Sequence, residues 1–285
     1  MSLIERFYPT DALTGLALLR QEGLRPNLCY LDPPYLTGRD FGAYADTASS
    51  EDYYAMMQSI LQAVYDLLDE NGSLFLHIDE RTHARLRLML DEIFPPESFR
   101  NEIIWAYQSG GRATTHFSRK HDTILYYAKS PDAFFDPMQD AQPRAAARKN
   151  HMKRGVDETG RPYSAITSHG KEYRYYDDEL VPPSDVWDDI PHLQQRDPER
   201  TGYPTQKPER LLRRIILCTT RPGDLVLDPF AGSGTTLAAA RALHRSFIGI
   251  DSSPQAERTI RERLALSDGV KQAVSQPVKY VPKDK

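Results

Sequence analysis

The 285-residue sequence has few cysteines and no long apolar run. Its two cysteines, Cys29 and Cys218, each lie within an apolar stretch, where a small thiol packs well and a metal site would lack partners. We therefore expect two buried thiols and no metal site. No segment reaches the roughly 20 apolar residues that a membrane span requires, and the first residues lack the apolar core of a signal peptide. These absences predict a cytoplasmic protein without membrane contact.

The sequence also lacks an excess of positive charge. Its formal net charge is -4 and its pI is near 6.1, whereas most nucleic-acid-binding domains are basic overall. Any DNA-binding surface is therefore expected to be local. Hydrophobic residues make up 40% of the chain and charged residues 27%, which suits one large core. We expect a single α/β domain with an insertion.

Two β-α-β patterns lie near opposite ends of the chain, and each begins with a short apolar run followed by residues at helical spacing. Such units form right-handed crossovers between parallel strands. Two β-rich, aromatic segments between them predict antiparallel strands at the edge of the same sheet. The fold class is therefore α/β, with a doubly wound, mixed sheet. The expected elements are strands 28–31, 73–78, 103–107, 123–128, 224–227 and 247–250, and helices 51–68 and 235–243.

The stretch 136–200 differs in character, since it is polar, contains prolines and is weakly periodic. We expect it to be an insertion between two halves of one catalytic domain, residues 1–135 and 201–285. It carries a basic cluster, for which composition leaves two interpretations open: a solvated helix face or a surface that contacts phosphates. The cluster consists of Arg144, Arg148, Lys149, Lys153 and Arg154.

A glycine-containing turn at residues 228–236 follows the expected strand 224–227 and opens a helix, where the backbone can approach a ligand closely. Leu237 stands where a dinucleotide-binding turn needs glycine or alanine, and the Gly-Lys-Ser/Thr of a P-loop is missing. Asp251 ends the next strand, where an acidic side chain accepts hydrogen bonds from ribose. The alternative is a plain turn with an exposed aspartate. The pattern favours a ribose-containing cofactor without pyrophosphate.

The motif Asp32-Pro33-Pro34-Tyr35 directly follows a buried strand, unlike the other Pro-Pro pairs at 95–96 and 182–183, which predict only turns. An aspartate accepts a hydrogen bond from an amino group, and the carbonyl of Pro33 offers a second acceptor. Tyr35 provides a flat face for stacking. These groups suit a planar base that carries NH2.

The sequence resembles the amino-methyltransferases of DNA. The resemblance rests on Asp32-Pro33-Pro34-Tyr35, on 230–236 (Phe-Ala-Gly-Ser-Gly-Thr-Thr) and on 201–208 (Thr-Gly-Tyr-Pro-Thr-Gln-Lys-Pro), and it covers most of the chain. The order, with the target-base half before the cofactor half, is similar to the β arrangement of that family. It implies the Rossmann-like fold of S-adenosylmethionine-dependent methyltransferases, with 136–200 as the target-recognition region.

The resemblance also implies roles for individual residues. Those expected around the cofactor are Asp228, Phe230, Ala231, Gly232, Ser233, Gly234 and Thr235 at its methionine part, Asp251 at its ribose, Thr205, Gln206 and Lys207 closing the pocket, and Asp11 at its adenine amino group. Asp32, Pro33, Pro34 and Tyr35 are the expected catalytic residues, and Arg148, Lys149, Lys153 and Arg154 the expected DNA contacts.

The expected activity is site-specific methylation of a flipped base in double-stranded DNA, at adenine N6. The chemistry requires no metal. Cytosine N4 is the alternative, and a non-catalytic DNA-binding protein that senses S-adenosylmethionine is a rival from another class. A homodimer and a cognate restriction endonuclease are expectations from the family. The sequence does not give the recognition site.

Overall fold

The structure is a computed structural model, which describes residues 3–38, 49–108, 113–144 and 152–265. The chain divides into a main unit, Met1–Phe135 with Asp185–Lys285, and a smaller unit, Asp136–Ser184. Among the described residues, no helix has the length and apolar character needed to cross a bilayer.

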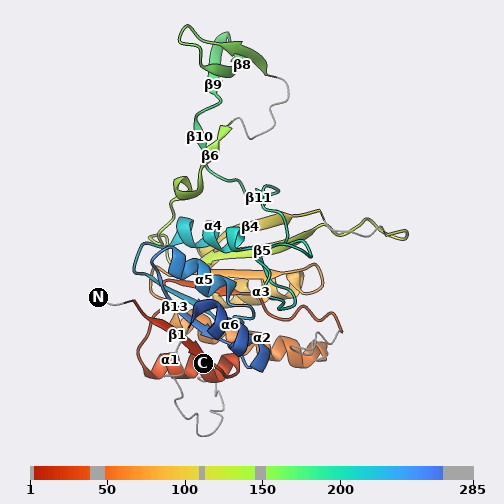
Figure 1. Cartoon of the computed structure of the whole chain (residues 1–285), viewed down its shortest axis with the longest axis vertical. Helices are drawn as coiled ribbons and strands as arrows, with labels where there is room; N and C mark the ends of the chain where they lie inside the picture. Colours follow the sequence, from red (N-terminus) through yellow and green to blue (C-terminus); the bar gives the residue numbers. More distant parts are fainter. Residues whose placement is uncertain (1–2, 39–48, 109–112, 145–151, 266–285) are drawn as a thin grey trace. The chain divides into compact units, whose positions relative to one another are not determined.

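The main unit contains an eight-stranded sheet of order β1-β13-β12-β2-β3-β5-β4-β11 (Figure 1). The neighbours from β1 to β3 run parallel, β5 lies antiparallel between β3 and β4, and β11 runs parallel to β4. The expected mixed, doubly wound sheet is thereby confirmed. Its strands are β1 Glu5–Tyr8, β2 Leu28–Leu31, β3 Ser73–Ile78, β4 Phe99–Ala106, β5 His121–Ala128, β11 Val186–Trp187, β12 Leu225–Asp228 and β13 Ser246–Ile250.

Helices cover both faces of this sheet, so its central strands β2 and β3 are buried at every position and mostly apolar. Helices α1 (Ala12–Gln21), α2 (Ser50–Leu67) and α3 (His83–Ile93) pack into the core on one face. Helices α4 (Glu209–Thr219), α5 (Thr235–Ala242) and α6 (Pro254–Leu264) pack on the other (Figure 1). A short 3-10 helix, η1 (Pro96–Ser98), precedes β4.

Local sequence explains where the helices begin and which side they bury. The hydroxyl of Ser49 accepts a hydrogen bond from the Asp52 N–H and caps α2, whose apolar residues then recur at helical spacing.

Cys29 lies in β2 and Cys218 in α4, and both are free, buried thiols, as expected.

The smaller unit consists of β-structure that the sequence did not predict. A three-stranded antiparallel sheet is formed by β7 (Lys153–Val156), β8 (Pro162–Ser168) and β9 (Lys171–Tyr176). β6 (Gln142–Pro143) pairs with β10 (Leu180–Val181), and η2 (Pro137–Asp140) precedes them. Most side chains of β7 and β9 are exposed on both faces of the sheet, because neither face packs on a large core. The sequence of these strands therefore shows no clear alternation of apolar and polar residues.

Residues 185–200, which we expected in the insertion, lie with the main unit. β11 extends the sheet beside β4, and the Ile190 carbonyl accepts a hydrogen bond from the buried indole of Trp105 at 2.8 Å. The Arg214 guanidinium of α4 pairs with Asp189 at 2.9 and 2.5 Å. These contacts join the segment to the core, although its polar composition resembles that of the insertion.

Candidate active site

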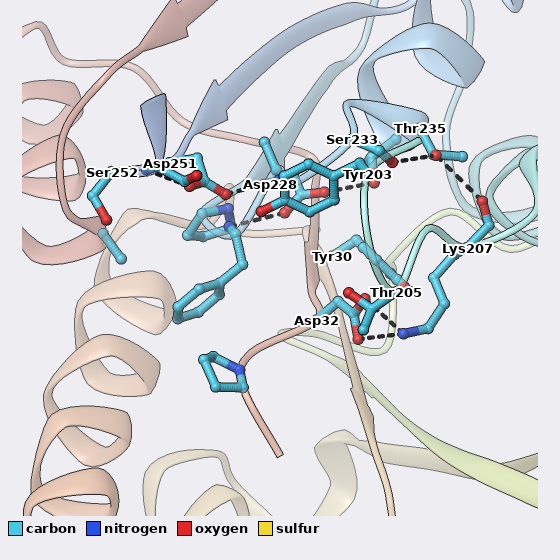
Figure 2. Close-up of a pocket in the computed structure, with 18 of the residues that line it drawn as sticks. Tyr30, Asp32, Tyr203, Thr205, Lys207, Asp228, Ser233, Thr235, Asp251 and Ser252 are labelled. Atoms are coloured by element: carbon cyan, nitrogen blue, oxygen red, sulfur yellow. Dashed lines mark hydrogen bonds and ion pairs between the residues drawn. The ribbon is translucent and has the colours of Figure 1, made fainter. Parts of the chain in front are cut away.

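Four aspartates lie at the carboxyl ends of parallel strands in the main unit. Asp32 follows β2, Asp228 ends β12, Asp251 follows β13, and Asp11 lies beyond β1. Because parallel strands end at the same edge of a sheet, their side chains are brought together, and ligands bind at this edge in α/β folds. All four line one cavity of about 520 Å³. Figure 2 shows three of them, Asp32, Asp228 and Asp251.

The cavity collects most of the site residues expected from the sequence. Its wall includes Asp11, Asp32, Pro34, Thr205, Gln206, Lys207, Asp228, Phe230, Ala231, Gly232, Ser233, Thr235 and Asp251. Pro33, Tyr35 and Gly234 are not among its lining residues, although Tyr35 is hydrogen-bonded to Asp32 and Gly234 caps α5. Tyr30, Tyr203 and Ser252 also line it and were not predicted (Figure 2).

Asp251 and Asp228 hold the turn between β12 and α5. Asp251 accepts hydrogen bonds at 2.8 Å from the main-chain N–H groups of Gly232 and Ser253. Asp228 accepts from the Phe230 N–H and the Thr236 hydroxyl. Burial raises the pKa of Asp228 to about 7 and also raises the pKa of Asp251, because a desolvated carboxylate is disfavoured. The same burial makes a cationic partner favourable there.

Asp11 lines the cavity and also caps the N-terminus of α1. Its carboxylate accepts from the N–H of Thr14 at 2.9 Å and from the Thr14 hydroxyl at 2.7 Å, at the N-terminus of α1. A carboxylate has about four acceptor positions, so two remain. Asp11 therefore stabilises the helix and still offers acceptors to the cavity.

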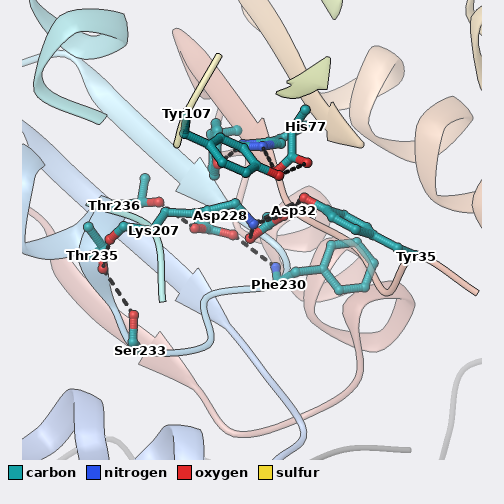
Figure 3. Close-up of polar contacts among 12 residues, drawn as sticks. Asp32, Tyr35, His77, Tyr107, Lys207, Asp228, Phe230, Ser233, Thr235 and Thr236 are labelled. Carbon is teal, nitrogen blue, oxygen red and sulfur yellow. Dashed lines mark hydrogen bonds and ion pairs between the residues drawn. The ribbon is translucent and has the colours of Figure 1, made fainter. Parts of the chain in front are cut away.

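Asp32 forms a compact cluster with Tyr35 and Lys207 (Figure 3). The Tyr35 hydroxyl donates to Asp32 Oδ1 at 2.6 Å. Lys207 Nζ lies 2.8 and 2.7 Å from the two carboxylate oxygens and 3.0 Å from the Tyr35 hydroxyl. Burial raises the pKa of Tyr35 well above 10, so its hydroxyl stays neutral and acts as a donor. The structure thus places Lys207, which we expected at the cofactor, on Asp32.

A buried polar network lies behind this cluster and was missed by the sequence analysis (Figure 3). His77 of β3 is fully buried, and its ring nitrogens lie 2.8 Å from the Tyr30 hydroxyl and 3.1 Å from Asp122. The Tyr107 hydroxyl donates to Asp122 at 2.8 Å.

The protonation of this network follows from its partners. Burial lowers the pKa of His77, which favours the neutral ring. Burial is the largest single effect and acts to raise the pKa of Asp122, but the hydrogen bonds from His77 and Tyr107 and the nearby Lys207 ammonium together outweigh it, so the pKa is lowered. An ionised Asp122 only accepts, so Nε2 of His77 donates to it, and Nδ1 accepts from Tyr30. Tyr30, which lines the cavity, is thereby fixed in place.

The expected DNA contacts lie in the smaller unit. Arg148 and Lys149 fall outside the described residues. Lys153 and Arg154 are on β7, a strand, so the helix-face interpretation does not apply to them. Arg154 pairs with Asp177 through hydrogen bonds of 2.7 and 2.6 Å. Lys153 is exposed.

A family model described as DNA methylase, of the N6 and N4 type, matches residues 27–262. The type II methyltransferase M.EcaI of Enterobacter cloacae is 30% identical, over 91% of this chain and 69% of its own length. The DNA adenine methyltransferase YhdJ of Escherichia coli K12 is 31% identical, over 85% of this chain and 76% of its own length.

Solved structures share the fold. M1.HpyAVI in complex with SAM has a TM-score of 0.61 at 22% identity and covers 92% of this chain and all of that one. The cytosine-N4-specific PvuII DNA methyltransferase has a TM-score of 0.63 at 16% identity, and the match covers 95% of this chain and 89% of that one. Because the family model spans both strand-end motifs, the chain belongs to the N6 and N4 amino-methyltransferases of DNA.

Proposed function

We propose that the protein methylates N6 of adenine at a specific site in double-stranded DNA. The observation that carries the proposal is Asp32, which leads an Asp-Pro-Pro-Tyr sequence at the carboxyl end of β2 and faces the cavity. A leading aspartate resembles the adenine enzymes more often, and the similar YhdJ acts on adenine. Cytosine N4 presents the same amino geometry and is the second candidate.

The cavity suits S-adenosylmethionine in size and charge. Its volume lies in the range of ligand pockets, and four carboxylates outnumber one ammonium among its described lining residues. Gly232 has a φ of +49° and lies beside Tyr203, so its backbone reaches the cavity where a side chain would crowd it. In this proposal Asp251 holds the ribose, Asp11 the adenine amino group, and the turn 230–235 the methionine part.

S-adenosylmethionine, when bound, supplies an electrophilic methyl group on a sulfonium centre. The residues must make the amino nitrogen nucleophilic, because its lone pair is delocalised into the ring. Asp32 and the Pro33 carbonyl accept hydrogen bonds from the NH2 group, which favours a tetrahedral nitrogen and stabilises the positive charge that develops there. Tyr35 stacks on the base, which has to leave the duplex to reach the cavity. Its neutral hydroxyl keeps Asp32 oriented.

The test is to express the chain in a host free of DNA methylation and to sequence the DNA with detection of modified bases. N6-methyladenine at one recurrent sequence is expected, whereas N4-methylcytosine would assign the other base. Asp32→Ala should abolish the signal, and the exposed Asp132→Ala serves as a matched control. Cofactor binding without methylation in the unaltered protein would instead support the non-catalytic sensor.

We also propose that basic residues of the smaller unit contact DNA phosphates. Lys153 is the clearest candidate because it is exposed, whereas Asp177 already neutralises Arg154. Lys153→Ala should weaken binding to all sequences alike and reduce the slope of affinity against salt by about 1, with a smaller change for Arg154→Ala. An unchanged slope in Lys153→Ala would remove this contact from the proposal.

A second copy of the chain and a cognate endonuclease are the proposed partners. Sedimentation of the purified protein tests the first. The second is tested by exposing unmethylated plasmid, and plasmid methylated by this chain, to a candidate endonuclease: a cognate enzyme should cleave only the unmethylated plasmid.

A further inference from the structure

Lys207 connects the two halves of the catalytic unit. Its ammonium contacts both carboxylate oxygens of Asp32, 175 residues away in the sequence. Its main-chain carbonyl accepts a hydrogen bond from the Thr235 hydroxyl at 3.3 Å, at the first residue of α5 (Figure 2). The side chains of Lys207 and Asp32 are only 11% and 18% exposed, so water screens this pair weakly.

Lys207 is the one cationic side chain among the described residues that line the cavity. The other three lining aspartates use neutral donors: Asp11 caps α1, Asp228 holds the Thr236 hydroxyl, and Asp251 holds two main-chain N–H groups. Of the four aspartates that line the cavity, only Asp32 accepts hydrogen bonds from an ammonium group. A carboxylate that enters this cavity therefore has Lys207 as its only lysine or arginine partner in the described wall.

Two functional requirements compete for this ion pair. The amino group of a target base needs an acceptor on Asp32, whose oxygens already accept hydrogen bonds from the Tyr35 hydroxyl and the Lys207 ammonium. The methionine carboxylate of S-adenosylmethionine needs a cation, and N-termini of helices such as α5 also favour anions. The Lys207 ammonium has three N–H donors, and its three hydrogen bonds go to the two oxygens of Asp32 and to the Tyr35 hydroxyl, so a ligand carboxylate has to replace at least one of these partners.

We propose that Lys207 exchanges partners during the reaction cycle, leaving Asp32 for the carboxylate of the cofactor. The exchange frees acceptor positions on Asp32 at the moment when the cofactor is in place, so the base pocket becomes competent only after the cofactor binds. Lys207 is in this respect a positioning residue that acts through Asp32. The inference rests on the proposed function, because it needs a base whose amino group bonds Asp32.

The first experiment needs no DNA. Calorimetry compares S-adenosylhomocysteine, which carries the methionine carboxylate, with methylthioadenosine, which has the nucleoside and sulfur without it. Lys207→Met should lower the affinity for S-adenosylhomocysteine roughly tenfold, as expected for a lost charge-assisted hydrogen bond, and leave the affinity for methylthioadenosine unchanged. Lys207→Arg should restore most of the difference. An equal loss for both ligands, or no loss, overturns the exchange.

The second experiment follows the base with a duplex that carries fluorescent 2-aminopurine at the target position found by sequencing. In the unaltered protein, S-adenosylhomocysteine should increase the fluorescence of the unstacked base several-fold more than methylthioadenosine does. In Lys207→Met, the fluorescence should be high without either ligand. If the variant keeps the dependence on S-adenosylhomocysteine, the proposal fails.

Lys129→Met is the matched control, because Lys129 is 12% exposed and bonds the Leu68 carbonyl outside the cavity. Circular dichroism confirms that each variant is folded. Absence of methylation by the unaltered protein would contradict the proposed function itself. Methylation by the unaltered protein with unaltered ligand preference in Lys207→Met would contradict only the exchange.

Discussion

Binding of a sulfonium ligand should strengthen as the pH rises from 6 to 7, because Asp228 titrates in that range. Its carboxyl group is 2% exposed and has a pKa of about 7, raised by burial and by the neighbouring charges of Asp32 and Asp251. A cation that enters the cavity is stabilised by the ionised form and not by the protonated form. Protons and ligand therefore compete for the site.

The size of the effect follows from that pKa. If only the ionised form binds, apparent affinity is reduced about 11-fold at pH 6 and about twofold at pH 7, so it should increase roughly fivefold between them. The amino group of the ligand titrates near pH 8 and stays protonated over this interval.

Calorimetry with S-adenosylmethionine at pH 6, 6.5 and 7 measures this change. S-adenosylhomocysteine, which lacks the sulfonium charge, gives the reference profile, and Asp228→Asn should flatten the difference between the two ligands. The raised pKa also favours the folded state at low pH, a contribution of up to about 4 kcal/mol that is complete below about pH 4 and lost as the pH rises through 7. A flat difference in the unaltered protein, or one that persists in Asp228→Asn, would refute the reasoning.

Two predictions concern stability, measured by urea unfolding. Asp189→Ala should cost about 1–3 kcal/mol, because the Arg214 side chain is 2% exposed and loses two charge-assisted hydrogen bonds, while Asp189 is itself 48% exposed and its charge is partly screened by water; no measurable cost would contradict this account, and adding Arg214→Met should recover much of the loss. Gly234→Ala should cost about 1–3 kcal/mol, because its φ is +73° and a Cβ would lie 2.8 Å from Ile260. Gly160→Ala, at φ +86° with open space around it, isolates the backbone part, and an equal cost for both would exclude the clash.

The sequence by itself determined the central strands and the helices that follow them. Residues 73–78 are buried at every position, and the apolar Leu74-Phe75-Leu76 within them predicts this strand directly. The motif beginning at Asp32 and the turn at 228–236 were located because each combines a strand end with residues that suit a particular chemistry. Such signals extend over only a few residues, and a single sequence is enough to show them.

Only the tertiary structure decided how distant residues combine. The pairing of Lys207 with Asp32 and the bond between His77 and Asp122 join side chains far apart in the sequence, and no periodicity encodes a contact across the sheet. The packing of 185–200 on the main unit likewise depends on one strand pair, the hydrogen bond from Trp105 to Ile190 and the Asp189 contact, within a segment whose composition is that of a loop. The pKa of Asp228 depends on burial and on the neighbouring carboxylates of Asp32 and Asp251, and both arise only when three strand ends meet at one edge of the sheet.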